Sequence, residues 1–289
     1  MPRPVTAGID GSAASLAAAS WAAWEAELHG AALHLVAAWP SLNGSGLDKS
    51  ESAARRRWAV RSLALAADRL SSRHPSLTIH TRVLDAPPME ALLTVGADAE
   101  LLVLGSRGLG TPSASPLGST SARTAAAAGF PVTLVRPPPH LDETPSDDAP
   151  VLLPLDVGHG RNDLSAAVAF DEAALRHVPL RALYVWIPPA PIRSCPVTPW
   201  EHGPSPRARR AERLLTEALA PWRRKFPDVR VEEVCLEDVP TCAVTTATKH
   251  ATLTVLGHRV TPGDTPRLGA VAHASICQEE SPVMLVPHA

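Results

Sequence analysis

A short segment around position 105 has the residue types and spacing of a phosphate-binding loop. Gly105-Ser-Arg-Gly108 is followed, after nine residues, by Gly118-Ser119. Glycines let the main chain approach a phosphate with no Cβ in the way. The free N–H groups of a helix start, joined by the Ser119 hydroxyl, favour an anion. The segment therefore predicts a backbone site for phosphate, with an ordinary glycine loop and helix start as the alternative.

The predicted elements on either side of this segment support the first interpretation. Residues 100–105 form a continuous apolar run, typical of a short buried strand, and the alanine-rich residues 119–128 are typical of a helix. In an open α/β sheet, ligands bind at the carboxyl ends of the strands, where strand order reverses. We expect Gly105 to lie at such a strand end.

The chain repeats itself, with matching positions roughly 150 residues apart. Asp10 is matched by Asp156, Gly105 by Gly257, and Gly118 by Gly269. Between the copies lies a run rich in proline and acidic residues, which offers little to a hydrophobic core. We predict a domain at residues 1–138, a linker at 139–149 and a second domain at 150–289.

Each copy predicts strands and helices in alternation. In the first copy we expect helices at residues 13–29, 50–73, 88–97 and 119–128, and strands at 4–9, 33–38, 77–83, 101–104 and 132–135. In the second copy we expect strands at residues 151–155, 180–185, 229–234, 253–256 and 283–286. This order predicts an α/β fold of two tandem, Rossmann-like domains, each with a five-stranded parallel sheet.

Composition excludes several classes of function. The net charge is −2, so no field for binding nucleic acid is expected, and the arginine clusters at residues 55–57 and 207–210 are predicted to be solvated. The start of the chain does not resemble a secretory segment, and no apolar run is long enough to span a bilayer, so we expect a cytoplasmic protein. The four cysteines form no C-x-x-C pair, so we expect buried thiols and no metal site. We also expect no catalytic residue.

The first copy resembles a universal stress protein domain of the nucleotide-binding kind. The resemblance rests on Asp10 after the first strand, Gly105-x-x-Gly108-x9-Gly118-Ser119 after the fourth, and Pro131-Val132 at the fifth. It implies a fold like that of the adenine nucleotide alpha hydrolases, a role in the stress response, and ATP or a related adenine nucleotide as ligand, with or without Mg²⁺.

The resemblance also implies a role for each matching residue, from the adenosine end to the phosphates. For Asp10, which follows the first strand, the alternative is a role as helix N-cap or turn residue. For Arg107 the alternative is a solvated side chain without a ligand. The nucleotide-binding residues implied are Ile9, Asp10, Ala38, Gly105, Arg107, Gly108, Gly118, Ser119 and Thr120.

The second copy resembles the same domain in degraded form. Val260 stands where the first copy has Gly108, and eight residues instead of nine separate it from Gly269. Ala270 stands at the position of Ser119 and has no hydroxyl. A β-branched residue resists positive φ and places a side chain where phosphate would approach. We therefore expect one nucleotide per chain, in the first copy.

Two classes of function follow from these observations. The first is a nucleotide-binding regulatory protein, in which ATP sets the conformation of the loop at residues 106–117 for an unknown protein partner; slow ATP hydrolysis or self-phosphorylation stays open. The second is a scaffold or interaction module in which both sites are vestigial. In either case the apolar closing strands at residues 132–135 and 283–286 need covering. We expect them to pair across a pseudo-two-fold axis, with a homodimer of the whole chain as a further possibility.

Overall fold

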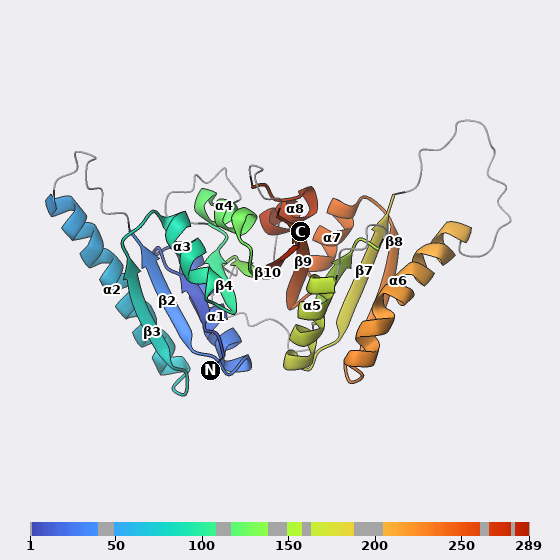
Figure 1. The fold of residues 1–289 in the computed structure, drawn as a ribbon, viewed down its shortest axis with the longest axis horizontal. Helices are drawn as coiled ribbons and strands as arrows, with labels where there is room; N and C mark the ends of the chain where they lie inside the picture. Colours follow the sequence, from blue (N-terminus) through green and yellow to red (C-terminus); the bar gives the residue numbers. More distant parts are fainter. Residues whose placement is uncertain are drawn as a thin grey trace.

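A computed structural model describes residues 2–39, 49–107, 117–137, 149–157, 163–187, 205–260, 266–278 and 281–288. Its strands form one ten-stranded sheet in the order β3-β2-β1-β4-β5-β10-β9-β6-β7-β8. Figure 1 shows this sheet running along the longest axis of the molecule, with helices on both faces. We call β1–β5 with their helices the first half and β6–β10 with theirs the second half.

The first half follows the predicted alternation closely. The differences from the expected boundaries are one or two residues, at strand and helix ends where hydrogen bonding frays. Its elements are β1 (Val5–Gly8), α1 (Ala13–Leu28), β2 (Leu33–Ala38), α2 (Lys49–Arg73), β3 (Ile79–Leu84), α3 (Pro88–Ala97), β4 (Leu101–Gly105), α4 (Ser119–Ala127) and β5 (Val132–Val135).

The second half repeats this order, but β8 lies two to three residues later than expected and the last two strands are longer than expected. Residues 257–259 continue β9 beyond the predicted end, and residues 287–288 continue β10. Its elements are β6 (Val151–Leu155), α5 (Asp163–Arg176), β7 (Leu180–Trp186), α6 (Pro206–Lys225), β8 (Val231–Glu237), α7 (Pro240–Thr248), β9 (Leu253–Arg259), α8 (Ala270–Gln278) and β10 (Val283–His288).

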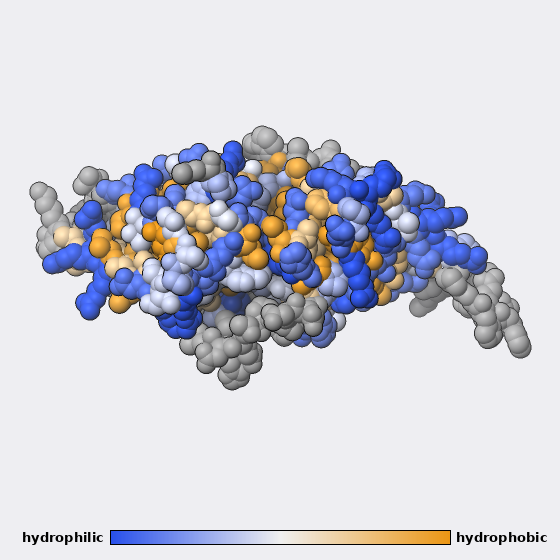
Figure 2. Space-filling view, turned by 90° about the horizontal axis from the view of Figure 1, so that it is seen from below, coloured by the Kyte–Doolittle hydropathy of each residue, from blue (hydrophilic) through white to orange (hydrophobic). Residues whose placement is uncertain are grey.

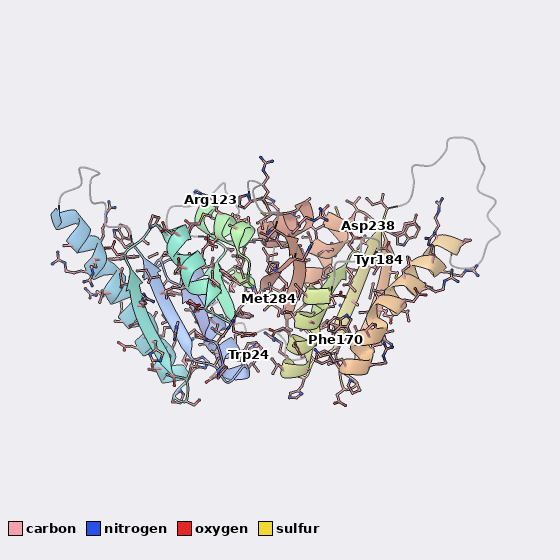
Figure 3. The ribbon with its side chains drawn as sticks, in the orientation of Figure 1. Trp24, Arg123, Phe170, Tyr184, Asp238 and Met284 are labelled. Carbon is pink, nitrogen blue, oxygen red and sulfur yellow. The ribbon has the colours of Figure 1, made fainter. Side chains whose placement is uncertain are left out.

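The two halves join through their closing strands. Strands within each half pair in parallel, whereas β5 and β10 pair antiparallel with the register Val283↔Leu134, Met284↔Thr133 and Leu285↔Val132. Met284 accordingly lies at the centre of the molecule (Figure 3). The predicted fold class and the predicted pairing of the closing strands are both confirmed. All but the last residue of the predicted linker lies outside the described residues.

Two hydrophobic layers run across both halves. Helices α1, α2, α5 and α6 bury their apolar residues on one face of the sheet, and α3, α4, α7 and α8 on the other. Ala18, Ala22, Ala23 and Ala26 on α1 are fully buried, so this helix packs close to β1 and β4. In the second half Phe170 fills the matching layer, stacked on Trp222 and Phe226 (Figure 3).

A buried group of four charged side chains joins α1 to α5; we call it the interhelix quartet and define it as Glu25, His29, Glu172 and Arg176. The Nε2 atom of His29 lies 3.1 Å from Glu25 Oε1 and 3.4 Å from Glu172 Oε1, and Arg176 donates to both carboxylates. The Arg176 guanidinium also stacks on Trp24, whose side chain lies between the halves in Figure 3. Each helix contributes one acid and one base four residues apart, as expected for two copies related by a pseudo-two-fold axis.

The surface fits most of the compositional expectations. Arg56, Arg57 and the arginines of residues 207–210 are exposed, as predicted. On the face shown in Figure 2, hydrophobic side chains appear in separate groups among hydrophilic ones. Among the described residues, no helix has the length and apolar character needed to cross a membrane. The expectation of buried thiols is wrong: Cys242 lies on the exposed side of α7, and Cys235 and Cys277 are only partly buried. Cys195 lies outside the described residues.

Candidate functional site

The sequence-predicted site lies where the strand order of the first half reverses. From β1 the chain moves outward to β2 and then β3, and it returns to the other side of β1 as β4. The carboxyl ends of β1 and β4 therefore flank the switch point, where open α/β sheets bind ligands. The turn of residues 9–12 follows β1, and the start of the predicted glycine loop follows β4.

The turn after β1 is held by its own side chains. Asp10 Oδ1 accepts hydrogen bonds from the Ser12 amide at 3.0 Å and from the Ser12 hydroxyl at 2.6 Å. The same hydroxyl accepts from the Ser15 amide at 3.1 Å, so Ser12 is the N-cap of α1. Gly11 has φ +79°, which favours glycine. Asp10 is thus a turn aspartate and not the helix cap, while Ile9 is buried and donates its amide to Val36.

Gly105, at the end of β4, has a structural reason to be glycine. A Cβ on this residue would lie 2.6 Å from the carbonyl carbon of Ala14 and 2.8 Å from the Ser15 nitrogen. Real Cβ atoms do not come this close to backbone, so glycine is required for α1 to pack on β4. Its residue type alone therefore does not argue for a ligand. Beyond it, Arg107 is exposed and its carbonyl lies 3.4 Å from the Ser12 hydroxyl, whereas Gly108 lies outside the described residues.

Gly118 begins α4 directly beside this strand end. Its amide donates to the Ser106 carbonyl at 2.8 Å, and the Ser121 hydroxyl donates to the Gly105 carbonyl at 2.6 Å. Gly118 has φ −70° and ψ 138°, a conformation open to any residue, and its position has no side-chain cap. Ser119 and Thr120 are exposed at the first turn. Among the described residues, no side chain caps the first-turn amides of α4 beside β4, and free amides at a helix start attract an anion.

The predicted adenine end lies one strand further along the sheet. Ala38 ends β2 opposite Leu84, and the Trp39 amide donates to the Leu84 carbonyl at 2.8 Å. The structure thus brings together the turn at Asp10, the end of β4 and the start of α4 through hydrogen bonds. Ala38 shares the same edge of the sheet but has no hydrogen bond to these three segments among the described contacts.

Helix α2 contributes side chains that sequence reasoning missed. The Arg55 guanidinium carbon lies 5.1 Å from the centroid of the Trp39 ring. The six-membered ring of Trp58 lies against Gly11, where an added Cβ would be 2.5 Å from it. No spacing in the sequence connects these residues of α2 with the turn after β1, because the contact depends on how α2 packs along the sheet.

The matching region of the second half is built differently. The β9–β10 ladder continues through Pro287↔His258 and His288↔Arg259, and the Val260 amide donates to the His288 carbonyl at 2.9 Å. A Cβ on Gly257 would be 3.3 Å from the ring of His288. In the first half the corresponding ladder ends at Gly105↔Val135, followed by one bond from Ser106 to Val135. The carboxyl end of β9 is therefore paired with β10 over more residues than the end of β4 is with β5.

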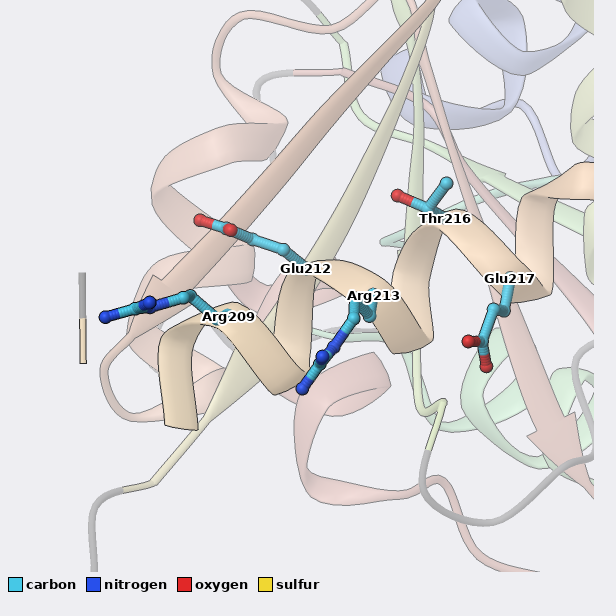
Figure 4. A pocket seen from close by; sticks show the side chains of 5 residues that line it. All are labelled: Arg209, Glu212, Arg213, Thr216 and Glu217. Atoms are coloured by element: carbon cyan, nitrogen blue, oxygen red, sulfur yellow. The ribbon is translucent and has the colours of Figure 1, made fainter. Parts of the chain in front are cut away.

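Two other features have functional residue types. A hollow of about 460 Å³ lies on α6, and the described residues that line it all belong to that helix (Figure 4): Arg209, Glu212, Arg213, Thr216 and Glu217. Side chains spread along one convex helix do not converge on a ligand as those of a binding cleft do. In the interhelix quartet, ligand atoms of Glu25, His29 and Glu172 lie within 4.8 Å of one another. The Arg176 guanidinium already bonds both carboxylates, so a cation occupies this place.

Comparisons with known proteins agree with this architecture. The sequence model of the universal stress protein family matches residues 1–136. A universal stress protein of Mycolicibacterium smegmatis is 33% identical over 295 residues, covering 98% of this chain and 96% of the relative. A universal stress protein of Mycobacterium tuberculosis is 30% identical over 262 residues, covering 88% and 86%.

A crystal structure supports the fold over the whole length. A universal stress protein from Archaeoglobus fulgidus superposes with a TM-score of 0.70 at 14% identity, covering 99% of this chain and 97% of that one. A sequence identity of 14% supports a shared fold and nothing further. Together with the relatives above, it leads to the conclusion that this chain belongs to the universal stress protein family.

Proposed function

We propose that this protein is a stress-response regulator that binds one molecule of ATP, in the first half. The observation that carries the proposal is the start of α4, whose uncapped amides lie beside the ends of β4 and β1 at the switch point. The triphosphate would lie over Gly118, Ser119 and Thr120, with Arg107 able to contribute a charge-assisted contact.

Gly118 supports the proposal more strongly than Gly105 does. Its backbone is extended, so glycine is not needed there for conformation, whereas Gly105 is needed for packing against α1. A buried glycine at a helix N-cap leaves the amides of the first turn open to close approach. The adenosine end would then lie toward Ile9, Asp10 and Ala38, as in the family resemblance.

The second half would bind no triphosphate in the family's manner. The Val260 amide is already bonded to His288, and the His288 ring lies over Gly257. Ala270, at the start of α8, has no hydroxyl. We therefore expect a stoichiometry of one.

The described residues of the site fit a regulatory ATP-binding role better than they fit ATP hydrolysis. Hydrolysis of a phosphoanhydride needs a metal, a positioned water and usually a base near the γ-phosphate. Asp10, the one carboxylate in the described part of this site, already accepts two hydrogen bonds from Ser12. With radiolabelled ATP, a turnover faster than roughly one per minute would contradict this part of the proposal, since enzymes commonly turn over each second or faster.

Isothermal titration calorimetry with ATP, with and without Mg²⁺, tests the proposal. Wild-type protein is expected to bind one equivalent, and Gly118→Val is expected to abolish binding because its side chain covers the first-turn amides. Valine can adopt the extended backbone of Gly118, and because this position is buried, thermal denaturation without ATP serves as the control that the variant is folded. Gly269→Val is the matched control in the second half and should bind like the wild type.

The same experiment separates this function from that of a scaffold with two vestigial sites. Two equivalents, undiminished binding by Gly118→Val, or lost binding by Gly269→Val would refute the assignment to the first half. Ligand at 100 times its dissociation constant should also stabilise the fold by about 2.7 kcal/mol. No heat of binding and no thermal shift at millimolar ATP would favour the scaffold.

A further inference from the structure

Helix α4, which starts the proposed phosphate site, ends without a cap of its own. Its C-cap residue Ala128 has φ −69° and ψ 129°, so the chain leaves the helix in an extended conformation. The left-handed residue whose amides usually return to the last carbonyls is therefore missing. Ala125, Ala126 and Ala128 are buried, so the last carbonyls of α4 need partners from elsewhere in the protein.

The partner of one of these carbonyls comes from the second half. The His258 ring nitrogen Nε2 lies 3.0 Å from the Ala126 carbonyl oxygen, and the His258 side chain is buried. With its proton on Nε2, the imidazole donates to this oxygen. A donor at the C-terminal end of a helix also complements the partial negative charge there.

The reverse contact caps the equivalent helix of the second half. Arg136, which follows β5, donates from Nη2 to the Cys277 carbonyl on α8 at 2.9 Å. Each half therefore supplies a donor to the last helix of the other half. The two contacts differ in one respect, because α4 begins at the proposed nucleotide site and α8 begins at the altered one.

We propose that His258 is a positioning residue for the nucleotide site: by capping α4 from the second half, it fixes the helix whose first turn receives the phosphates. This inference rests on the proposed function. At its start α4 is tied to the strand end by Gly118 and Ser121, and at its end by His258. Two anchors at opposite ends of a helix about 13 Å long set the direction in which its first-turn amides point.

Three variants test the role of His258. His258→Leu removes the donor and leaves a buried carbonyl without a partner, and it is expected to weaken ATP binding roughly fivefold. His258→Gln keeps an N–H donor on a side chain of similar reach, and its affinity is expected to stay within about twofold of the wild type. Arg136→Met removes the cap of α8 and should leave ATP affinity unchanged while lowering thermal stability.

A second measurement needs no nucleotide. Hydrogen exchange of the hydrogen-bonded amides of residues 122–127 should be faster in His258→Leu than in the wild type, with Arg136→Met and His258→Gln unchanged. The exchange of these helical amides reports how firmly α4 is held even if the wild type binds no ATP.

The outcomes distinguish the inference from the proposed function. Wild-type affinity in His258→Leu, or equal weakening by His258→Leu and Arg136→Met, would overturn the positioning role, since the second result indicates general loosening of the halves. Failure of His258→Gln to restore affinity would also overturn it. No ATP binding by the wild type would refute the proposed function, and unchanged exchange in His258→Leu would refute the capping itself.

Discussion

The interhelix quartet makes the stability of the fold depend on pH through His29. Its hydrogen bonds to Glu172 and Glu25 raise the pKa of His29 from 6.5 to about 10 in the folded protein. A group with a raised folded pKa contributes stability that is fully present below the unfolded pKa, here 6.5, and is lost as the pH rises through the folded value. Between pH 6 and pH 10 the full shift would correspond to a loss of about 4 kcal/mol in the free energy of unfolding, which is an upper bound because the His29 ring is partly exposed and solvent screens its ion pairs.

Replacing His29 isolates this contribution. We expect His29→Asn to be less stable than the wild type by a few kcal/mol at pH 6, because the protonated imidazole and its hydrogen bonds to Glu25 and Glu172 are lost from a buried site. At pH 10 the difference should shrink by up to about 4 kcal/mol. Comparing the two proteins cancels the titration of groups outside the quartet. Glu25, whose pKa is raised to about 7 by burial and by the Glu172 charge, is coupled to His29 and titrates differently in the variant. The assay is urea denaturation at both pH values.

The control is His74→Asn, which removes another pair of histidine and glutamate. His74 Nδ1 lies 2.8 Å from Glu27 Oε2 within the first half, at a partly exposed position. Exposed ion pairs contribute about 0–1 kcal/mol, so this variant should differ little from the wild type at either pH. A stability difference between wild type and His29→Asn that is the same at pH 6 and pH 10 would refute the reasoning.

Three further predictions concern packing, capping and strand pairing. Gly105→Ala should lower the free energy of unfolding by about 1–3 kcal/mol, because its Cβ would meet the backbone of α1. Gly257→Ala should cost less than about 1 kcal/mol, because its Cβ would meet only side-chain atoms, those of His288 and Ser165, at 3.3 Å or more. Equal effects in thermal denaturation would contradict the packing argument. Ser12→Ala removes the N-cap of α1 and should cost about 1 kcal/mol in urea denaturation, with no measurable loss counting against the cap. Deleting residues 283–289 should uncover the apolar edge of β5 and cause association in light scattering; an equally stable monomer would show that the edge needs no cover.

The fold could be predicted from the sequence because its signals are local and occur twice. Continuous apolar runs give the buried strands, alanine-rich segments give the helices, and the internal repeat gives the pairing of β5 with β10 by symmetry. The positions of Asp10, Gly105 and Gly118 at one edge of the sheet follow from the same alternation, since parallel strands end at the same edge.

What the sequence could not give are contacts that depend on the placement of whole elements. The interhelix quartet has a visible pattern, an acid and a base four residues apart in each copy, but the contact between copies requires the pseudo-two-fold arrangement of α1 and α5. The packing of Trp58 on Gly11 depends on how α2 lies along the sheet. Gly105 looked like a phosphate-binding glycine, and only the distance to Ala14 gives its structural reason.

The end of β9 shows why treating the second half as a copy of the first was misleading. In the first half β4 ends at Gly105, and the same end was expected at Leu256. Residues 257–259 instead extend the strand, and its burial alternates, with Gly257 and Arg259 exposed and His258 buried between them. This alternation directs the His258 side chain to the face of the sheet that carries α4. The extension that lengthens the β9–β10 ladder therefore also brings a hydrogen-bond donor to the helix of the first half.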